Sequence, residues 1–295
     1  MSDASPASLD RRLHPVRPDL AAESYRGRVE ADAFAPGVAM QVAADSVALR
    51  PVPDLARSID TEALHGEAFT VYETRADGWA WGQLETDGYV GYLPAEALGA
   101  VGEAPTHRVA ILRSYRYPDA ELRSPPLGLL SMGARVRVIG HATTRGLEFA
   151  LLDDGSAMVA RHLVPLDHRE ADWVGVAETF LGTPYLWGGR TSLGLDCSAI
   201  VQLAAAAAGL ALPRDTDMQE SEVGEPLDIA AGLPALTRGD LVFWKGHVGI
   251  MRDGETLLHA NGHSMSVASE PLAPAVARIA RNEWGAVTSV RRIAW

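Results

Sequence analysis

The stretch that decides the fold is residues 194–202, which read Gly-Leu-Asp-Cys-Ser-Ala-Ile-Val-Gln. Its cysteine, Cys197, is the only one among 295 residues, and it lies where a tight loop turns into a helix. Two apolar segments farther along the chain each carry a histidine, His247 and His259. A lone cysteine at a helix start, with histidines on later strands, is the arrangement that a thiolate nucleophile needs. The sequence therefore predicts that the chemistry lies in the C-terminal part of the chain.

The thiol needs a local environment that favours its ionised form. A free cysteine has a pKa of about 8.5, and catalytic cysteines react as thiolates at lower pH. The unpaired N–H groups and the dipole of a helix N-terminus lower the pKa of a thiol placed there. Asp196 and Ser198 flank Cys197, and one of them can cap the helix. We therefore expect the pKa of Cys197 to be lowered.

The histidines have spacings that suit two different roles. His247 follows a Lys-Gly turn and opens an apolar segment, so it is the predicted general base. His259 lies across one turn, on what should be the adjacent antiparallel strand, where it can orient the imidazole of His247. His263 is the alternative, although Gly262 is expected to end the strand before it.

The bulk composition excludes several classes of protein. The chain is 47% hydrophobic and 22% charged, as in ordinary globular proteins. A net charge of −12 without clustered lysine or arginine argues against nucleic acid or an anionic membrane as partner. One cysteine excludes an intrachain disulfide, and no Cys/His pattern predicts a metal site. The first residues contain no apolar segment typical of a signal peptide, so we expect a cytoplasmic protein, with a cryptic export route left open. No cofactor is expected. The oligomeric state stays open.

The chain divides into four segments that differ in composition and predicted secondary structure. Residues 1–24 are polar and predict a tail. Residues 25–101 contain several short β-rich runs separated by Asp-Gly turns, and residues 105–167 repeat that plan. A repeat of about 60 to 75 residues without helices suits two small β-barrels. Residues 168–295 predict a helix from Glu170, the Cys197 helix closed by Gly209, and then strands at 240–244, 248–252, 256–260 and 287–293, which together make an α+β domain.

Motifs in both halves resemble known families. Residues 79–84, Trp-Ala-Trp-Gly-Gln-Leu, and 88–94, Gly-Tyr-Val-Gly-Tyr-Leu-Pro, resemble bacterial SH3-like (SH3b) domains. The C-terminal motifs together resemble the NlpC/P60 cysteine peptidases of bacterial cell-wall peptides; they are Leu-Gly-Thr-Pro-Tyr-Leu-Trp-Gly-Gly (181–189), Asp-Cys-Ser (196–198), Leu-Pro-Arg-Asp (212–215), Gly-Asp-Leu-Val-Phe (239–243), His-Val-Gly-Ile (247–250) and Leu-His-Ala (258–260). The resemblance implies two small SH3-like β-barrels followed by an α+β, papain-like NlpC/P60 domain. Ala199 departs from it, because the family usually has glycine there.

The resemblance also implies a function. Similar architectures occur in γ-D-glutamyl-L-diamino acid endopeptidases, which recycle peptidoglycan stem peptides whose N-terminal L-alanine is free. The implied substrate is a peptidoglycan-derived peptide, with either diaminopimelate or lysine as its third residue. Two alternatives remain: an amidase or acyltransferase on the same fold, and a wall-peptide-binding module with a vestigial catalytic domain.

The substrate-binding roles are carried over from the resemblance. Asp196 would pair with the ammonium of L-alanine, helped by Tyr185, while Ser198 and Trp187 would shape the pocket. A further tyrosine would come from the first SH3b domain, where Tyr89 is our choice over a structural role for that ring. Its acidic partner stays open among Asp54, Asp60 and Glu67.

Overall fold

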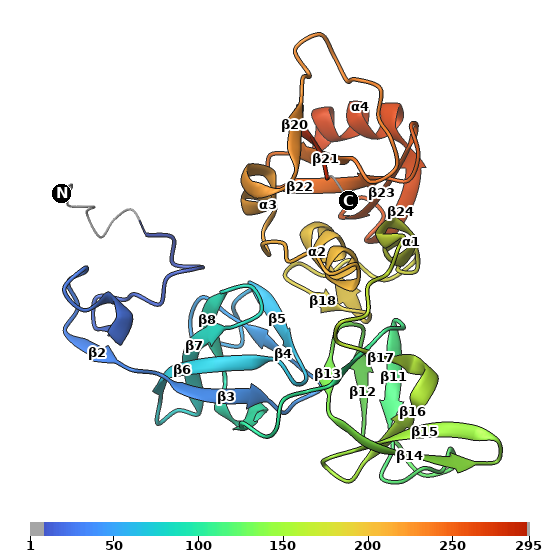
Figure 1. Cartoon of the computed structure of the whole chain (residues 1–295). Coiled ribbons are helices and arrows are strands. Elements are labelled where there is room, and N and C mark those ends of the chain that lie inside the picture. The colour runs from blue at the N-terminus through green and yellow to red at the C-terminus, as the bar shows by residue number, and fades with distance from the viewer. Residues whose placement is uncertain (1–8, 294–295) are drawn as a thin grey trace. The chain divides into compact units, whose positions relative to one another are not determined.

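The computed structural model describes residues 9–293. The chain separates into two compact units, Met1–Leu166 and Asp167–Trp295 (Figure 1). The first is built of strands and short 3-10 turns, and the second combines four α-helices with a six-stranded sheet among its described residues. This is the expected pairing of a β-rich SH3-like region with an α+β domain.

The first barrel occupies the middle of unit 1. Its five-stranded sheet has the order β8-β7-β6-β3-β9, and every pairing in it is antiparallel. The strands are β3 (Val38–Val42), β6 (Ala68–Thr74), β7 (Trp79–Leu84), β8 (Val90–Pro94) and β9 (Leu98–Ala100), and a hairpin of β4 (Ser46–Leu49) and β5 (Thr61–Leu64) completes the barrel. Leu49, Phe69, Leu84 and Leu93 are among the side chains of its buried core. Gly78 has a positive φ in the turn between β6 and β7, as the Asp-Gly signal predicts.

The described part of the N-terminal segment is docked on this barrel; the sequence predicted a tail over residues 1–24, with partial docking as an open alternative. Its elements are β1 (Leu20–Ala22), the 3-10 turn η2 (Glu23–Tyr25) and β2 (Ala33–Ala35), which pairs with β1 in parallel. Arg17 donates to Glu73 and to the Tyr92 hydroxyl, both at 2.7 Å, and its guanidinium lies 4.2 Å from the Trp81 ring centroid. Residues 1–8 of the predicted tail lie outside the described residues. The polar composition hid this contact, because a guanidinium over an aromatic ring leaves no periodic pattern.

The second barrel repeats the ending of the first. In each, a strand leads into a one-turn 3-10 helix and then a short strand: η3 (Ala95–Ala97) before β9, and η4 (Ala160–His162) before β17. The strands of the second barrel are β10 (His107–Val109), β11 (Arg113–Arg116), β12 (Gly128–Ser131), β13 (Arg135–Val136), β14 (Val138–Thr144), β15 (Leu147–Leu152), β16 (Ala157–Val159) and β17 (Leu163–Pro165). They form sheets in the orders β13-β10-β17, β11-β12 and β14-β15-β16.

Unit 2 is organised around an antiparallel sheet of order β20-β25-β21-β22-β23-β24. Its strands are β20 (Glu225–Leu227), β21 (Leu241–Trp244), β22 (His247–Met251), β23 (Thr256–Asn261), β24 (Ser266–Pro271) and β25 (Val287–Arg292). The helices are α1 (Trp173–Glu178), α2 (Cys197–Ala207), α3 (Thr216–Glu222) and α4 (Leu272–Asn282), and a small hairpin joins β18 (Arg190–Thr191) to β19 (Gly194–Leu195). One core lies between the sheet and α4, where Trp244 and Leu257 meet Ile279. The sequence predicted the four central strands but not β24, α3 or α4.

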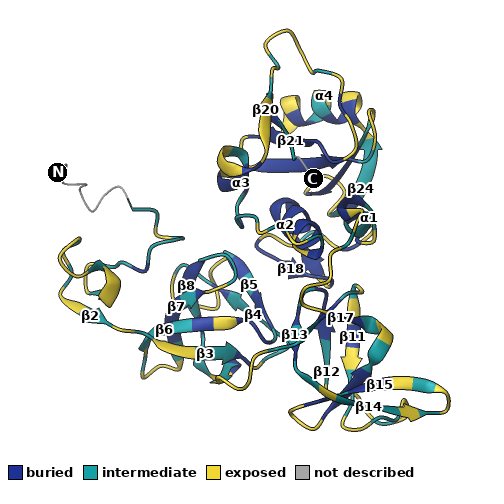
Figure 2. Cartoon of the chain, in the orientation of Figure 1, coloured by how far each residue is buried: buried dark blue, intermediate teal, exposed yellow. Residues whose placement is uncertain are grey.

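Helix α2 holds the cysteine at its first residue and contacts β22 and β23. It is buried along most of its length (Figure 2), and its alanines allow this close packing. Gly209 ends it as predicted: its φ is +87°, and the N–H groups of Gly209 and Leu210 bond back to the carbonyls of Ala206 and Ala205. A Cβ at Gly209 would meet only the end of the flexible Arg169 side chain, so it is the left-handed backbone conformation that favours glycine there. No helix in the described residues is long and apolar enough to cross a membrane.

Candidate active site

Asp196 caps the helix that presents Cys197. The Asp196 backbone is extended, and its carboxylate accepts the N–H of Ala199 at 2.9 Å, so α2 begins at the cysteine. The cysteine is only 6% exposed. Its sulfur lies 3.6 Å from the Thr216 hydroxyl. Helix α2 packs against β22, and the backbone N–H of Val248 on that strand helps to lower the pKa of the thiol.

Burial gives the thiol the opposite pKa shift from the one that the sequence predicted. Burial, and then the negative charge of Asp196, raise the pKa of Cys197 to about 11, against the lowering influence of Thr216, the Val248 N–H and Arg214. The expected lowering by the helix N-terminus is therefore outweighed by desolvation. At neutral pH the sulfur is a thiol and not a thiolate.

The predicted base is also uncharged. His247 is buried at the start of β22, and the Trp244 ring packs against it with the centroids 5.5 Å apart. Burial, then the charges of His259 and Arg278, lower the pKa of His247 to about 3, with Glu270 opposing. Its Nε2 lies 2.8 Å from Nδ1 of His259. Nδ1 is therefore the His247 nitrogen left to take a proton from the thiol.

The structure brings His259, and not His263, to His247. The pairs Ile250–Leu258 and Met251–Leu257 fix the register of β22 with β23, which puts His259 one step diagonally from His247. The other nitrogen of His259, Nε2, lies 2.8 Å from Oε1 of Glu270 on β24.

Two residues that the sequence did not reveal complete this chain of contacts. Arg278 of α4 holds both carboxylate oxygens of Glu270, at 2.5 and 2.8 Å. Hydrogen bonds from His259 and Arg278 lower the pKa of Glu270 to about 2, so it is a carboxylate at neutral pH. Glu270 lies in a segment with little β-propensity, and only the pairing of β23 with β24 brings it to His259.

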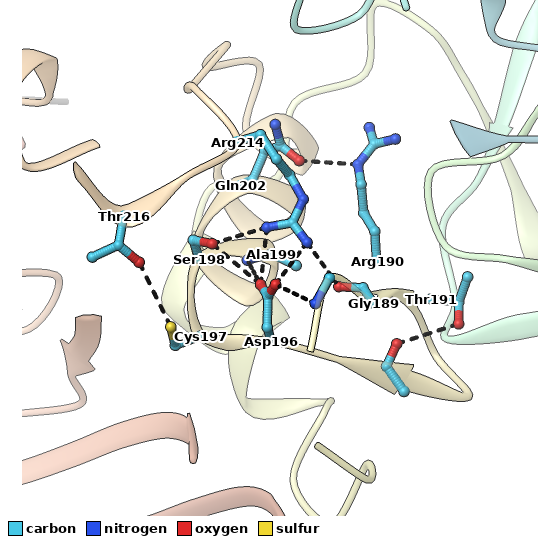
Figure 3. A network of polar contacts seen from close by, with 12 residues as sticks. Gly189, Arg190, Thr191, Asp196, Cys197, Ser198, Ala199, Gln202, Arg214 and Thr216 are labelled. Carbon is cyan, nitrogen blue, oxygen red and sulfur yellow. Dashed lines mark hydrogen bonds and ion pairs between the residues drawn. The ribbon is translucent and has the colours of Figure 1, made fainter. Parts of the chain in front are cut away.

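The carboxylate of Asp196 is already fully engaged. It accepts hydrogen bonds from the N–H groups of Gly188 and Ala199, from the Ser198 hydroxyl, and from both terminal nitrogens of Arg214, at 2.8 to 3.2 Å (Figure 3). Arg214 is completely buried and also donates to the Ser198 oxygen at 2.8 Å. An ionised carboxylate offers about four lone-pair sites. The structure therefore places Asp196 and Ser198 in a hydrogen-bonded network with Arg214, and the pairing of Asp196 with the substrate ammonium stays a prediction.

A cavity of about 500 Å³ opens beside His247. It is lined by Tyr185, Trp187, His247, Gly262, His263, Asn282, Glu283 and Trp284. Burial, and then the charge of Cys197, raise the pKa of Tyr185. Trp187 is 56% exposed at the cavity wall. Among the predicted pocket residues, the structure thus brings Tyr185 and Trp187 to the cavity, and Asp196 and Ser198 to the network with Arg214.

The substrate residues expected from unit 1 stay predictions. Tyr89 is buried in the loop that precedes β8. Of the acidic candidates, Asp54 lies 3.9 Å from Arg57 and Asp60 lies 3.1 Å from Arg11. Glu67 is buried and accepts the N–H of Leu64 at 2.7 Å. Within residues 9–293, no group of three or more His, Cys, Asp or Glu side chains is arranged to hold a metal ion.

Comparisons with known proteins agree with this arrangement. Residues 182–284 match the NlpC/P60 family, and residues 49–98 match the bacterial dipeptidyl-peptidase SH3 domain. The chain carries an NlpC/P60 cysteine-peptidase domain. Its NlpC/P60 match covers the cysteine, both histidines and the Glu270–Arg278 pair, and its SH3 match covers most of the first barrel.

The similarity to one relative extends over both units of the chain. Over 249 residues the chain is 25% identical to the gamma-D-glutamyl-L-lysine dipeptidyl-peptidase of Bacillus cereus, covering 74% of this chain and 72% of that protein. It is 33% identical over 113 residues to dipeptidyl-peptidase 6 of Lysinibacillus sphaericus, covering 38% of this chain and only 40% of that protein. The crystal structure of an NlpC/P60 family protein from Bacillus cereus has the same fold, with a TM-score of 0.70 over 86% of this chain and 99% of that chain, at 19% identity.

Proposed function

We propose that this protein hydrolyses the bond between the γ-carboxyl of D-glutamate and the diamino acid in peptidoglycan stem peptides, and that its substrates carry a free N-terminal L-alanine. The observation that carries the proposal is the placement of Cys197 at the start of α2, a helix that packs against β22. That strand begins with His247, whose Nε2 lies 2.8 Å from Nδ1 of His259. The substrate class is supported by the 25% identity to a gamma-D-glutamyl-L-lysine dipeptidyl-peptidase, which extends over 74% of this chain.

The reaction begins from a neutral thiol and a neutral imidazole. Cys197 attacks the γ-glutamyl carbonyl while its proton passes to Nδ1 of His247, which forms a C–S bond and an oxyanion. The backbone N–H groups next to the sulfur at the start of α2 stabilise that oxyanion, whereas the N–H of Ala199 already bonds to the Asp196 carboxylate. His247 then returns the proton to the departing amine of the diamino acid, and the C–N bond breaks. Water, deprotonated by His247, releases L-Ala-γ-D-Glu from the thioester.

Recognition of the alanine amine is assigned differently from the sequence-based prediction. Asp196 is neutralised by Arg214, so an ammonium at that carboxylate would compete with a buried, bidentate ion pair. We propose that Tyr185 at the cavity contributes to amine binding, and that Asp196 acts by holding the loop and the start of α2 in place. Tyr89 remains in the proposal as a residue to be tested by substitution.

A peptide with a free alanine amine has already lost its sugar, so we propose a recycling role in the cytoplasm. The test is mass spectrometry of the products from two matched substrates. One is free L-Ala-γ-D-Glu-diaminopimelate or its lysine analogue, and the other is the same peptide with its amine blocked by N-acetylmuramic acid. Cleavage of only the free peptide, lost in Cys197→Ala, is the expected result. Equal cleavage of both would contradict amine reading and favour wall remodelling, while cleavage of neither would favour the amidase or binding-module alternatives.

A further inference from the structure

We infer that Glu270 is a positioning residue that fixes the tautomers of both histidines, so that Nδ1 of His247 carries the lone pair that receives the thiol proton. The inference rests on the proposed function only for the role of Cys197. It concerns the contacts among three buried or half-buried groups, and Glu270 lies outside the residues predicted from the sequence.

The direction of each hydrogen bond in the series His247–His259–Glu270 follows from the carboxylate of Glu270. An ionised carboxylate can only accept, so the 2.8 Å contact with Glu270 requires a proton on Nε2 of His259. In the state to which the inference applies, His259 is a neutral imidazole, and its Nδ1 then has a lone pair. That lone pair, 2.8 Å from Nε2 of His247, requires a proton on the latter nitrogen. The His247 ring is thus left with an unprotonated Nδ1.

Arg278 keeps the carboxylate of Glu270 ionised and in place. Its guanidinium approaches both oxygens of Glu270, and its Nε donates to Glu283 at 3.2 Å, so both carboxylates lie around one cation. His259 is fully buried, so water cannot readily replace the carboxylate as its acceptor. Without that acceptor, the hydrogen bond between the two histidines can reverse, so that Nδ1 of His259 donates to Nε2 of His247. His247 would then carry its own proton on Nδ1, and this nitrogen could not accept a proton from the thiol.

The first test uses the wild-type protein and needs no substrate. Two-bond ¹H–¹⁵N spectra of histidine-labelled protein distinguish the two neutral tautomers, and His247→Asn and His259→Asn assign the signals. We expect both histidines to be protonated on Nε2 near pH 7. A proton on Nδ1 of either ring would overturn the inference, whatever the protein cleaves.

The second test compares Glu270→Gln with Ser269→Ala. Ser269 lies on the same strand, and its hydroxyl accepts from Arg252 at 3.0 Å, away from the histidines. Because a glutamine amide can donate as well as accept, the Glu270→Gln variant loses the obligatory acceptor. We therefore expect a mixture of His259 tautomers and a fall in kcat of roughly 10- to 100-fold with little change in KM, the size of effect seen for hydrogen-bond partners that orient metal-bound imidazoles. Ser269→Ala should leave tautomers and kcat unchanged. An active wild type with unchanged kcat and tautomers in Glu270→Gln would refute the inference, while an inactive wild type with the expected tautomers would refute only the proposed function.

Discussion

Both terminal nitrogens of Arg214 donate to the carboxylate of Asp196, at 2.9 and 2.8 Å. Asp196 is the residue immediately before the nucleophile, Cys197. The guanidinium has no exposed surface, so the two charges compensate one another out of water. The pair ties residues after α2 to the loop before it, because Arg214 also donates to the carbonyl of Gly189 at 3.1 Å. The position of Cys197 therefore depends on a buried ion pair.

Asp196→Asn tests this structural role. An asparagine oxygen can still cap α2, but it leaves the buried Arg214 charge without a counter-charge, so we expect a loss of about 3 to 5 kcal/mol in the free energy of unfolding. Urea unfolding at pH 7 measures it, and cleavage of free and amine-blocked peptides should fall in the same proportion. A variant of normal stability that loses only the free-amine preference would restore Asp196 as the ammonium ligand.

The raised pKa of Cys197 predicts slow alkylation of the substrate-free protein. With a pKa of about 11, the thiolate fraction at neutral pH is far below that of a free cysteine, whose pKa is about 8.5. We expect the rate constant with iodoacetamide to lie below that of N-acetylcysteine at pH 7 and to rise steeply above pH 9. Thr216→Val removes a hydroxyl that favours the thiolate, so it should slow the reaction further. Rapid labelling at pH 6 would contradict the neutral thiol–imidazole pair. Since the chain has one cysteine, every adduct reports on this site.

Burial of neutral His247 predicts that acid destabilises the protein. Its folded pKa, about 3, lies below the unfolded value near 6.5, so its contribution is complete above pH 6.5 and is lost as the pH falls toward 3. Between pH 7 and pH 5 this loss should be on the order of 2 kcal/mol. Urea unfolding at both pH values measures it in the wild type, in His247→Asn and in the exposed-site control His263→Asn. His247→Asn should reduce the pH dependence, and an equal reduction in the control would count against this assignment.

The docking of the N-terminal segment depends on Arg17. This side chain is 16% exposed and contacts Glu73, Tyr92 and the Trp81 ring, whereas Arg26 is 59% exposed and pairs with nearby Glu23. We expect Arg17→Ala to speed hydrogen exchange over residues 9–25, because a partly buried cation–π contact and a charged hydrogen bond are worth about 1 to 3 kcal/mol together. Arg26→Ala is the matched control and should change little. Equal exchange in the two variants would show that Arg17 does not hold the segment.

Local patterns predicted the parts of the site that neighbouring residues determine. The loop-to-helix turn at Cys197 and the αL glycine at 209 are set by backbone rules within a few residues. His259 followed from one turn between two strands. Glu270 and Arg278 did not, since their contacts need the edge strand β24 and a helix that packs over the sheet.

The roles of the charged residues were harder to predict than their positions. Arg214 was visible in the motif at 212–215, but its pairing with Asp196 needs the tertiary fold. The direction of the Cys197 pKa shift likewise depends on how deeply the thiol is buried, which the helix start alone does not reveal.

The most direct test of the central claim is to trap the covalent intermediate. Rapid acid quenching during turnover of L-Ala-γ-D-Glu-L-lysine, followed by mass spectrometry of the peptide that contains Cys197, should reveal an L-Ala-γ-D-glutamyl thioester. The adduct should be absent from Cys197→Ala, which should also release no product. Continued cleavage by that variant, at a rate near that of the wild type, would contradict the claim that Cys197 attacks the γ-glutamyl carbonyl.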